Sequence, residues 1–122
     1  MIHQWAIQSG LDITEYSRDY FRNITYDINK NSRQWMWQVC TEFGWFQVPN
    51  PVFPMRSQLL KLDYWLQFCK DIFADSVGPP IVDYYNERYG GLDILGSNIV
   101  YANAIEDPWQ YAGMRHIHNT TT

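Results

Sequence analysis

An apolar run near the end of the chain, residues 98–103, constrains the fold more than any other feature of the sequence. Its centre, Ile99 to Ala102, is continuously apolar and is flanked by Asn98 and Asn103. A strand of this kind suits a position covered on both faces, as in a parallel sheet. Because one strand cannot form a sheet alone, we predict that the run returns to an α/β body whose other strands lie outside this chain.

Helical patterns precede this run. Apolar residues at helical spacing predict an amphipathic helix over residues 12–29, with acidic residues near its start. A second helix is expected to begin at Ser57, which would cap it, and a third to cover residues 81–89 and to end at Gly90. The apolar stripe of the second helix comprises Leu59, Leu62, Leu66, Cys69, Ile72 and Phe73.

The segment 33–47, RQWMWQVCTEFGWFQ, carries three of the six tryptophans and two phenylalanines. Its density of rings predicts that it is largely buried, and Gly44 leaves the path of its backbone open.

Length and composition limit the chain to one globular domain at most. Hydrophobic residues make up 46% of the 122 residues and charged residues 18%, with a net charge of −4. The scattered Lys and Arg residues argue against a nucleic-acid surface, and no apolar run is long enough to span a membrane. We also expect no cofactor and no metal.

Two cysteines, Cys40 and Cys69, are equally compatible with one disulfide and with two buried free thiols. A loop of about 30 residues would gain roughly 3–4 kcal/mol from an unstrained disulfide. Asn23-Ile24-Thr25 and Asn119-Thr120-Thr121 fit the N-glycosylation pattern, which gives weak support for a secretory compartment. Since Met1 to Trp5 do not resemble a secretory signal, we expect that the true start of the protein is missing.

Asp107 is the candidate functional residue because it follows the predicted strand. Functional groups gather beyond the carboxyl ends of strands in α/β sheets, and Pro108 excludes the helical region for the Asp107 backbone. A carboxylate presented in this way could be the acid of a Ser-His-Asp triad. The alternative is an aspartate that makes a turn before proline, which is very common.

The two segments RQWMWQVCTEFGWFQ and NIVYANAIEDPW resemble the family of lysosomal prolyl carboxypeptidase, dipeptidyl peptidase II and thymus-specific serine protease. The Arg-Gln-Trp and Gln-x-Cys-Thr-Glu-Phe-Gly run is most similar to the thymus-specific branch. The resemblance covers residues 11–113 and implies an α/β-hydrolase domain interrupted by a helical cap. Residues 1–92 would be the later part of the cap, and residues 93–122 the return to the hydrolase core.

The resemblance also implies roles for single residues. Asp107 matches the triad acid, and Trp109 matches a tryptophan that lines the pocket for the residue before the scissile bond, commonly proline. Trp109 could equally be a core ring that covers the end of the strand. Cys40 and Cys69 match two cysteines that are bridged in the family.

The chain departs from the family at several points. Ala104 stands where the family usually has glycine, and it would be strained if that position needs a positive φ. No Gly-x-Ser-x-Gly elbow is present, and His116 and His118 follow Asp107 too closely to serve as the catalytic base. His3 is expected to be a surface or core polar residue. We therefore expect a piece of an enzyme that is inactive alone.

Two classes of function follow from these observations. The first is a serine exopeptidase of the secretory pathway, lysosomal or secreted, which acts on peptides, including proline-containing ones; its parent could be a homodimer. The second is a non-catalytic secreted module whose exposed rings bind peptides or carbohydrates. A third possibility is a degenerate family member that serves as an interaction protein, and Ala104 is the feature in its favour.

Overall fold

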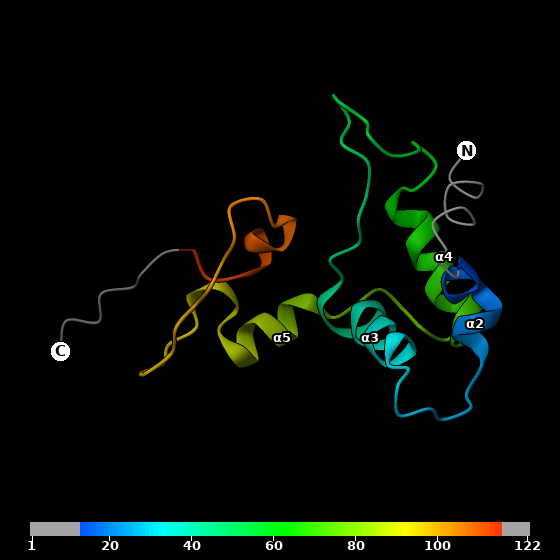
Figure 1. Cartoon of the computed structure of the whole chain (residues 1–122), viewed down its shortest axis with the longest axis horizontal. Helices are drawn as coiled ribbons and strands as arrows, with labels where there is room; N and C mark the ends of the chain where they lie inside the picture. The colour runs from blue at the N-terminus through cyan, green and yellow to red at the C-terminus, as the bar shows by residue number, and fades with distance from the viewer. Residues whose placement is uncertain (1–12, 116–122) are drawn as a thin grey trace. The chain divides into compact units, whose positions relative to one another are not determined.

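A computed structural model describes residues 13–115 of the chain. These residues form two compact units, divided after Pro80. Their regular elements are helical, with no β-strand between residues 13 and 115, and none of these helices is long and apolar enough to cross a membrane (Figure 1). The first unit contains η1 (Ile13–Tyr16), α2 (Arg18–Arg22), α3 (Ser32–Gln38), η2 (Val39–Phe43) and α4 (Leu62–Ile72), and the second contains α5 (Val82–Tyr89), η3 (Gly91–Asp93) and η4 (Pro108–Ala112).

The helix predicted over residues 12–29 is wrong in its extent, because short polar side chains interrupt it. Ser17 caps α2 by accepting the Tyr20 N–H at 3.1 Å. Beyond the end of α2, the Asn23 side chain accepts the Thr25 N–H at 2.9 Å, and Asp27 makes the same kind of contact two residues ahead. Such local bonds offer the backbone an alternative to the helix. Residues 23–31 are therefore irregular.

The aromatic segment forms α3 and continues into η2, a single turn of π-helix. The Gly44 N–H donates to the Val39 carbonyl at 3.1 Å, and the helix ends at Gly44, whose φ of 69° lies in the left-handed region. The prediction that this segment is largely buried is wrong for its tryptophans: Trp35, Trp37 and Trp45 each remain nearly half exposed. The buried residues of this helical stretch are Val39 and Cys40.

Helix α4 begins at Leu62, not at Ser57, whose hydroxyl accepts the Leu59 N–H in a turn. The predicted stripe is right in its second half, where Cys69 and Ile72 are buried, but Leu59 is 82% exposed. The small core lies where α4 packs against α2 (Figure 1). It consists of Phe21, Phe68 and Ile72, bordered by Tyr20, Met36, Trp65 and Phe73.

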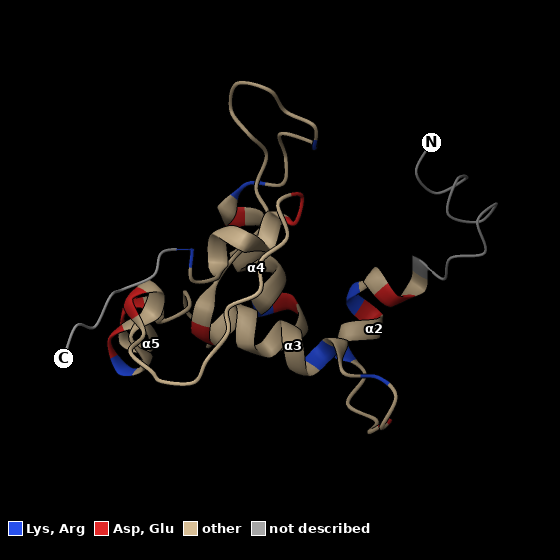
Figure 2. Cartoon of the chain, turned by 60° about the vertical axis from the view of Figure 1, so that its left-hand side comes forward, with Lys and Arg blue, Asp and Glu red and all other residues tan. Residues whose placement is uncertain are grey.

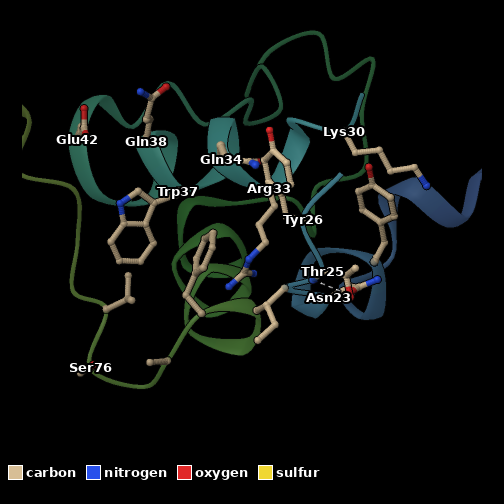
Figure 3. Close-up of a pocket in the computed structure, with 15 residues that line it drawn as sticks. Asn23, Thr25, Tyr26, Lys30, Arg33, Gln34, Trp37, Gln38, Glu42 and Ser76 are labelled. Carbon is tan, nitrogen blue, oxygen red and sulfur yellow. Dashed lines mark hydrogen bonds between the residues drawn. The ribbon is translucent and has the colours of Figure 1, made fainter. Parts of the chain in front are cut away.

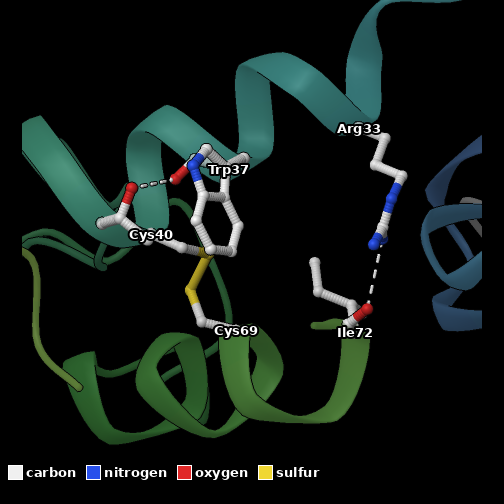
Figure 4. Close-up of a disulfide and its surroundings, with 6 residues drawn as sticks. Arg33, Trp37, Cys40, Cys69 and Ile72 are labelled. Atoms are coloured by element: carbon white, nitrogen blue, oxygen red, sulfur yellow. Dashed lines mark hydrogen bonds between the residues drawn. A yellow bond between two sulfur atoms is a disulfide. The ribbon is translucent and has the colours of Figure 1, made fainter. Parts of the chain in front are cut away.

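A disulfide joins Cys40 of η2 to Cys69 of α4, as the family resemblance implied (Figure 4). The Cα atoms are 5.7 Å apart, and both side chains are fully buried. The bridge places the helical aromatic segment along α4, where the Trp37 ring meets the Phe73 ring edge-on at 5.0 Å.

Arginine side chains satisfy backbone carbonyls at the ends of α2 and α4. The Arg33 guanidinium donates to the Phe21 and Ile72 carbonyls and lies 4.5 Å from the centre of the Phe73 ring (Figure 4). Arg22 donates to the Asp71 carbonyl at 2.7 Å. The last carbonyls of a helix have no partner within it, so these cations stabilise both helix ends.

The second unit begins with α5, close to the predicted bounds. Gly90 ends the helix with φ 90° and ψ −6°, and a Cβ atom there would come within 2.8 Å of the Ile94 backbone. This left-handed ending is the role that the sequence predicted for glycine at this position. Helix α5 carries the charged residues Asp83, Glu87 and Arg88, and α2 carries Arg18, Asp19 and Arg22 (Figure 2).

The strand predicted over residues 98–103 does not form, and this part of the expected fold is corrected. Asn98 has a positive φ of 59°, and Val100 is 91% exposed. A strand needs a neighbour to pair its N–H and C=O groups, and residues 13–115 supply no such strand. The apolar run therefore favours a strand, but the described part of the chain contains no strand with which it could pair.

Loss of the disulfide should destabilise the protein strongly. We expect Cys40→Ala with Cys69→Ala to lower the free energy of unfolding by about 3–4 kcal/mol, because the cross-link no longer restricts the unfolded chain. Urea denaturation followed by circular dichroism measures this change. Thiols that react with a labelling reagent in folded, unreduced protein would contradict the bridge.

Stability should also fall at low pH because of Asp71. Its carboxylate accepts from Gln67 and from Arg18, each at 2.8 Å, and these two contacts lower the pKa of Asp71, Gln67 contributing more. A pKa below that of the unfolded chain gives stability that is present at neutral pH and lost as pH falls through the folded value. We expect Asp71→Asn to flatten the acid side of the stability–pH curve, as measured by urea denaturation at a series of pH values.

Candidate functional site

The acid loop, residues 103–114, contains the candidate catalytic residue. Asp107 has φ −79° and ψ 116°, so its backbone is extended, as Pro108 requires. Pro108 then begins η4, where its fixed φ favours the first helical position. The prediction of an extended aspartate is confirmed. The carboxyl group thus leaves the backbone at a fixed point, directly before a helical turn.

The Asp107 carboxylate is held by the turn that follows it. Oδ1 accepts the backbone N–H of Trp109 at 2.9 Å, so the aspartate caps η4. This contact is a charge-assisted hydrogen bond, which is stronger than a neutral one. Asp107 therefore makes the turn that the common alternative predicted, and the same contact leaves Oδ2 as the oxygen suited to a further donor.

Two side-chain amides close the acid loop. Asn103 Nδ2 donates to the Met114 carbonyl at 2.7 Å, and Gln110 Nε2 donates to the Ile105 carbonyl at 2.5 Å. Asn103, which was expected to end a strand, thus joins the two ends of the loop. The sequence analysis did not predict these two hydrogen bonds, although Asn and Gln side chains in a short segment can bond to its own backbone and so hold a loop together.

Trp109 and Ala104 flank the acid in the sequence. Trp109 lies in η4 and is 40% exposed in the described part of the chain. The strain considered for Ala104 is not found: between residues 13 and 115, positive φ values outside glycine occur at Trp45 and Asn98.

No imidazole lies within residues 13–115, because His3, His116 and His118 are all outside the described residues. The sequon at Asn119 is outside them too. Within the described part of the chain, no three His, Cys, Asp or Glu side chains are grouped to hold a metal ion. The structure therefore places Asp107 and Trp109 in one loop, and residues 13–115 contain no histidine that could accompany them.

A pocket in the first unit was not predicted from the sequence. It has a volume of about 770 Å³ and lies between residues 20–30, the helical segment 33–42 and residues 73–77 (Figure 3). Asn23, the candidate glycosylation site, is exposed and lines this pocket. Because the helix predicted over residues 12–29 includes most of this wall, the sequence did not predict the irregular loop that forms it.

Comparison with known proteins places the chain in a family. The profile of the family described as Serine carboxypeptidase S28 matches residues 6–122. The chain is 35% identical over 107 residues to "Probable serine protease EDA2" of Arabidopsis thaliana, an alignment that covers 88% of this chain and 22% of that protein.

Two further relatives are similar to this chain. It is 30% identical over 106 residues to "Probable extracellular serine carboxypeptidase" of Arthroderma benhamiae, with 84% of this chain and 14% of that protein covered. It is 37% identical over 81 residues to "Thymus-specific serine protease" of Homo sapiens, with 63% of this chain and 15% of that protein covered.

No solved structure matches the chain. The chain spans about a fifth or less of the length of these relatives. Since the family profile matches nearly every residue, the chain belongs to the serine carboxypeptidase S28 family.

Proposed function

We propose that this chain is a segment of a serine-type exopeptidase, of prolyl carboxypeptidase or dipeptidyl peptidase type, in which Asp107 is the triad acid. The observation that carries the proposal is the fixed presentation of that carboxylate: Pro108 holds the backbone extended, and the Trp109 N–H holds Oδ1. Membership of the S28 family supplies the reaction class.

The chemistry assigns one task to Asp107. In a Ser-His-Asp triad the acid accepts the histidine Nδ1–H, fixes the tautomer and stabilises the imidazolium that forms as serine attacks the peptide carbonyl. Oδ2 of Asp107 would accept this N–H while Oδ1 remains bound to the backbone. No Gly-x-Ser-x-Gly elbow occurs in the 122 residues, so the serine and the histidine would come from the rest of the parent protein.

The substrate would be a peptide, with proline before the scissile bond where Trp109 lines the pocket. The exposed ring of Trp109, two residues after the acid, supports this role. Residues 1–92 would belong to a cap that narrows the cleft so that only a chain end enters, and residues 93–122 to the hydrolase core. The parent could form a homodimer; neither a membrane nor a nucleic acid takes part in the proposal.

The protein would act in the secretory pathway, in the lysosome or outside the cell. A relative carries the word "extracellular" in its name, and the buried disulfide suits an oxidising compartment. Asn23 would then be a glycosylation site, since its side chain is exposed within an Asn-Ile-Thr sequon.

One observation favours the second candidate, a non-catalytic module that binds peptides or carbohydrates. That function requires rings open to solvent, and Trp35, Trp37 and Trp45 are 46–47% exposed. A module would bind a ligand through them with no hydrolysis.

Asp107→Asn in the full-length parent enzyme should lower kcat by about 10⁴-fold, as the corresponding change does in other triads, because asparagine cannot hold the histidine in the correct tautomer. Steady-state hydrolysis of a proline-containing peptide measures this effect. Glu106→Gln is the matched control: it removes one negative charge from the neighbouring exposed residue and should leave turnover unchanged. Near-normal turnover of the Asp107 variant would remove this residue from the mechanism, whereas an unmodified parent protein without peptidase activity would favour the binding module.

A further inference from the structure

The pocket of the first unit has the size and the lining of a carbohydrate site. Its volume of about 770 Å³ falls within the range of roughly 300–1,000 Å³ that is typical of ligand pockets. Trp37 supplies an aromatic face, while Gln34, Gln38 and Glu42 supply amide and carboxylate groups from the same helical stretch (Figure 3). Amides both donate to and accept from hydroxyl groups, so this combination suits a sugar.

The Trp37 ring is held in place before any ligand binds. It packs edge-on against Phe73, with the ring centres 5.0 Å apart and an angle of 84° between the planes. The side chain nevertheless remains 46% exposed. A ring that is already fixed by packing loses little conformational freedom when a sugar stacks on it.

The cations of the pocket are engaged with the protein itself. The Arg33 guanidinium binds two backbone carbonyls and the Phe73 ring, and Lys30 Nζ lies 5.9 Å from the centre of the Tyr20 ring. Glu42 adds a negative charge to the lining. A neutral polyhydroxyl ligand therefore suits this pocket better than a phosphate or a carboxylate.

The pocket also contains a residue to which a sugar can be covalently attached, Asn23 of the N-glycosylation sequon. Asn23 and Thr25 of the sequon both line it, and in the view of Figure 3 they lie on one side while Trp37 lies on the other, with Arg33 between them. The contact of Asn23 with the Thr25 N–H uses the amide oxygen and not the nitrogen. The nitrogen is the atom that carries an N-linked sugar.

We propose that the pocket binds a glycan carried by the chain's own Asn23, with its first sugars resting against Trp37. This proposal depends on the secretory location proposed above. In the attachment step, Asn23 Nδ2 bonds to C1 of a lipid-diphosphate-linked oligosaccharide. The C1–oxygen bond to the diphosphate breaks, the lipid diphosphate leaves with the electron pair, and the amide nitrogen loses one proton.

The test is protection of the Asn23 glycan from enzymatic removal. The chain is secreted from a eukaryotic host with Asn119→Gln, which leaves Asn23 as the glycan acceptor under study, and glycopeptide mass spectrometry measures occupancy. A glycan bound about 90% of the time should be released by a peptide N-glycosidase about tenfold more slowly from folded protein than from denatured protein.

Trp37→Ala should abolish this protection because it removes the aromatic face. Trp35→Ala is the matched control: Trp35 lies on the same helix with almost the same exposure but does not line the pocket, so protection should persist. If Trp37→Ala fails to form the disulfide, the double variant Gln34→Ala and Gln38→Ala, at two exposed positions, decides the question in its place.

Three results would overturn the proposal: an unmodified Asn23, equal release from folded and denatured protein, or protection that survives loss of the pocket side chains. Hydrolysis of peptides is not measured in this experiment. A failure here therefore leaves the role of Asp107 unaffected, and loss of the peptidase proposal would not change the glycan result.

Discussion

The first unit depends on the covalent link between η2 and α4. Its apolar core is small, with Phe21, Phe68 and Ile72 at the centre and the two cysteines beside them. A core of this size contributes little free energy on its own, and small secreted units commonly use disulfides for this reason. The bridge from Cys40 to Cys69 holds the aromatic segment against α4. The contact of Trp37 with Phe73 and the reach of Arg33 to the Ile72 carbonyl both require this closeness.

Features governed by local chemistry could be predicted from the sequence. Gly90 ends α5 in the left-handed conformation, where a Cβ atom would meet the Ile94 backbone. Asp107 is extended because the ring of the following proline excludes the helical region. The pairing of Cys40 with Cys69 could not be predicted from spacing, which was compatible with a disulfide and with two free thiols. The family resemblance implied the disulfide, and the structure contains it.

Three features were predicted wrongly, one because of local side-chain hydrogen bonds and two because they depend on distant partners. The periodic apolar positions of residues 12–29 indicated one helix, but a hydrophobic pattern does not register that Ser17 and Asn23 divert the backbone hydrogen bonds. The apolar run 98–103 needs strands that residues 13–115 do not provide. Likewise, the density of rings in residues 33–47 indicated burial, although Trp35 and Trp37 are 47% and 46% exposed in the described part of the chain. The apolar run 98–103 and the rings of residues 33–47 have the predicted composition, but whether they form a strand or a buried layer depends on neighbouring segments.

The acid loop does not depend on distant segments in the way that the predicted strand 98–103 does. Its geometry comes from contacts within residues 103–114: Asn103 with Met114, Ile105 with Gln110, and Asp107 with Trp109. A loop built in this way can present its carboxylate whether or not a sheet stands beside it. The sheet would instead set where the loop stands relative to an imidazole. The orientation of the Asp107 carboxylate is thus set by this chain, and under the proposed function its distance from a histidine would be set by the rest of the parent protein.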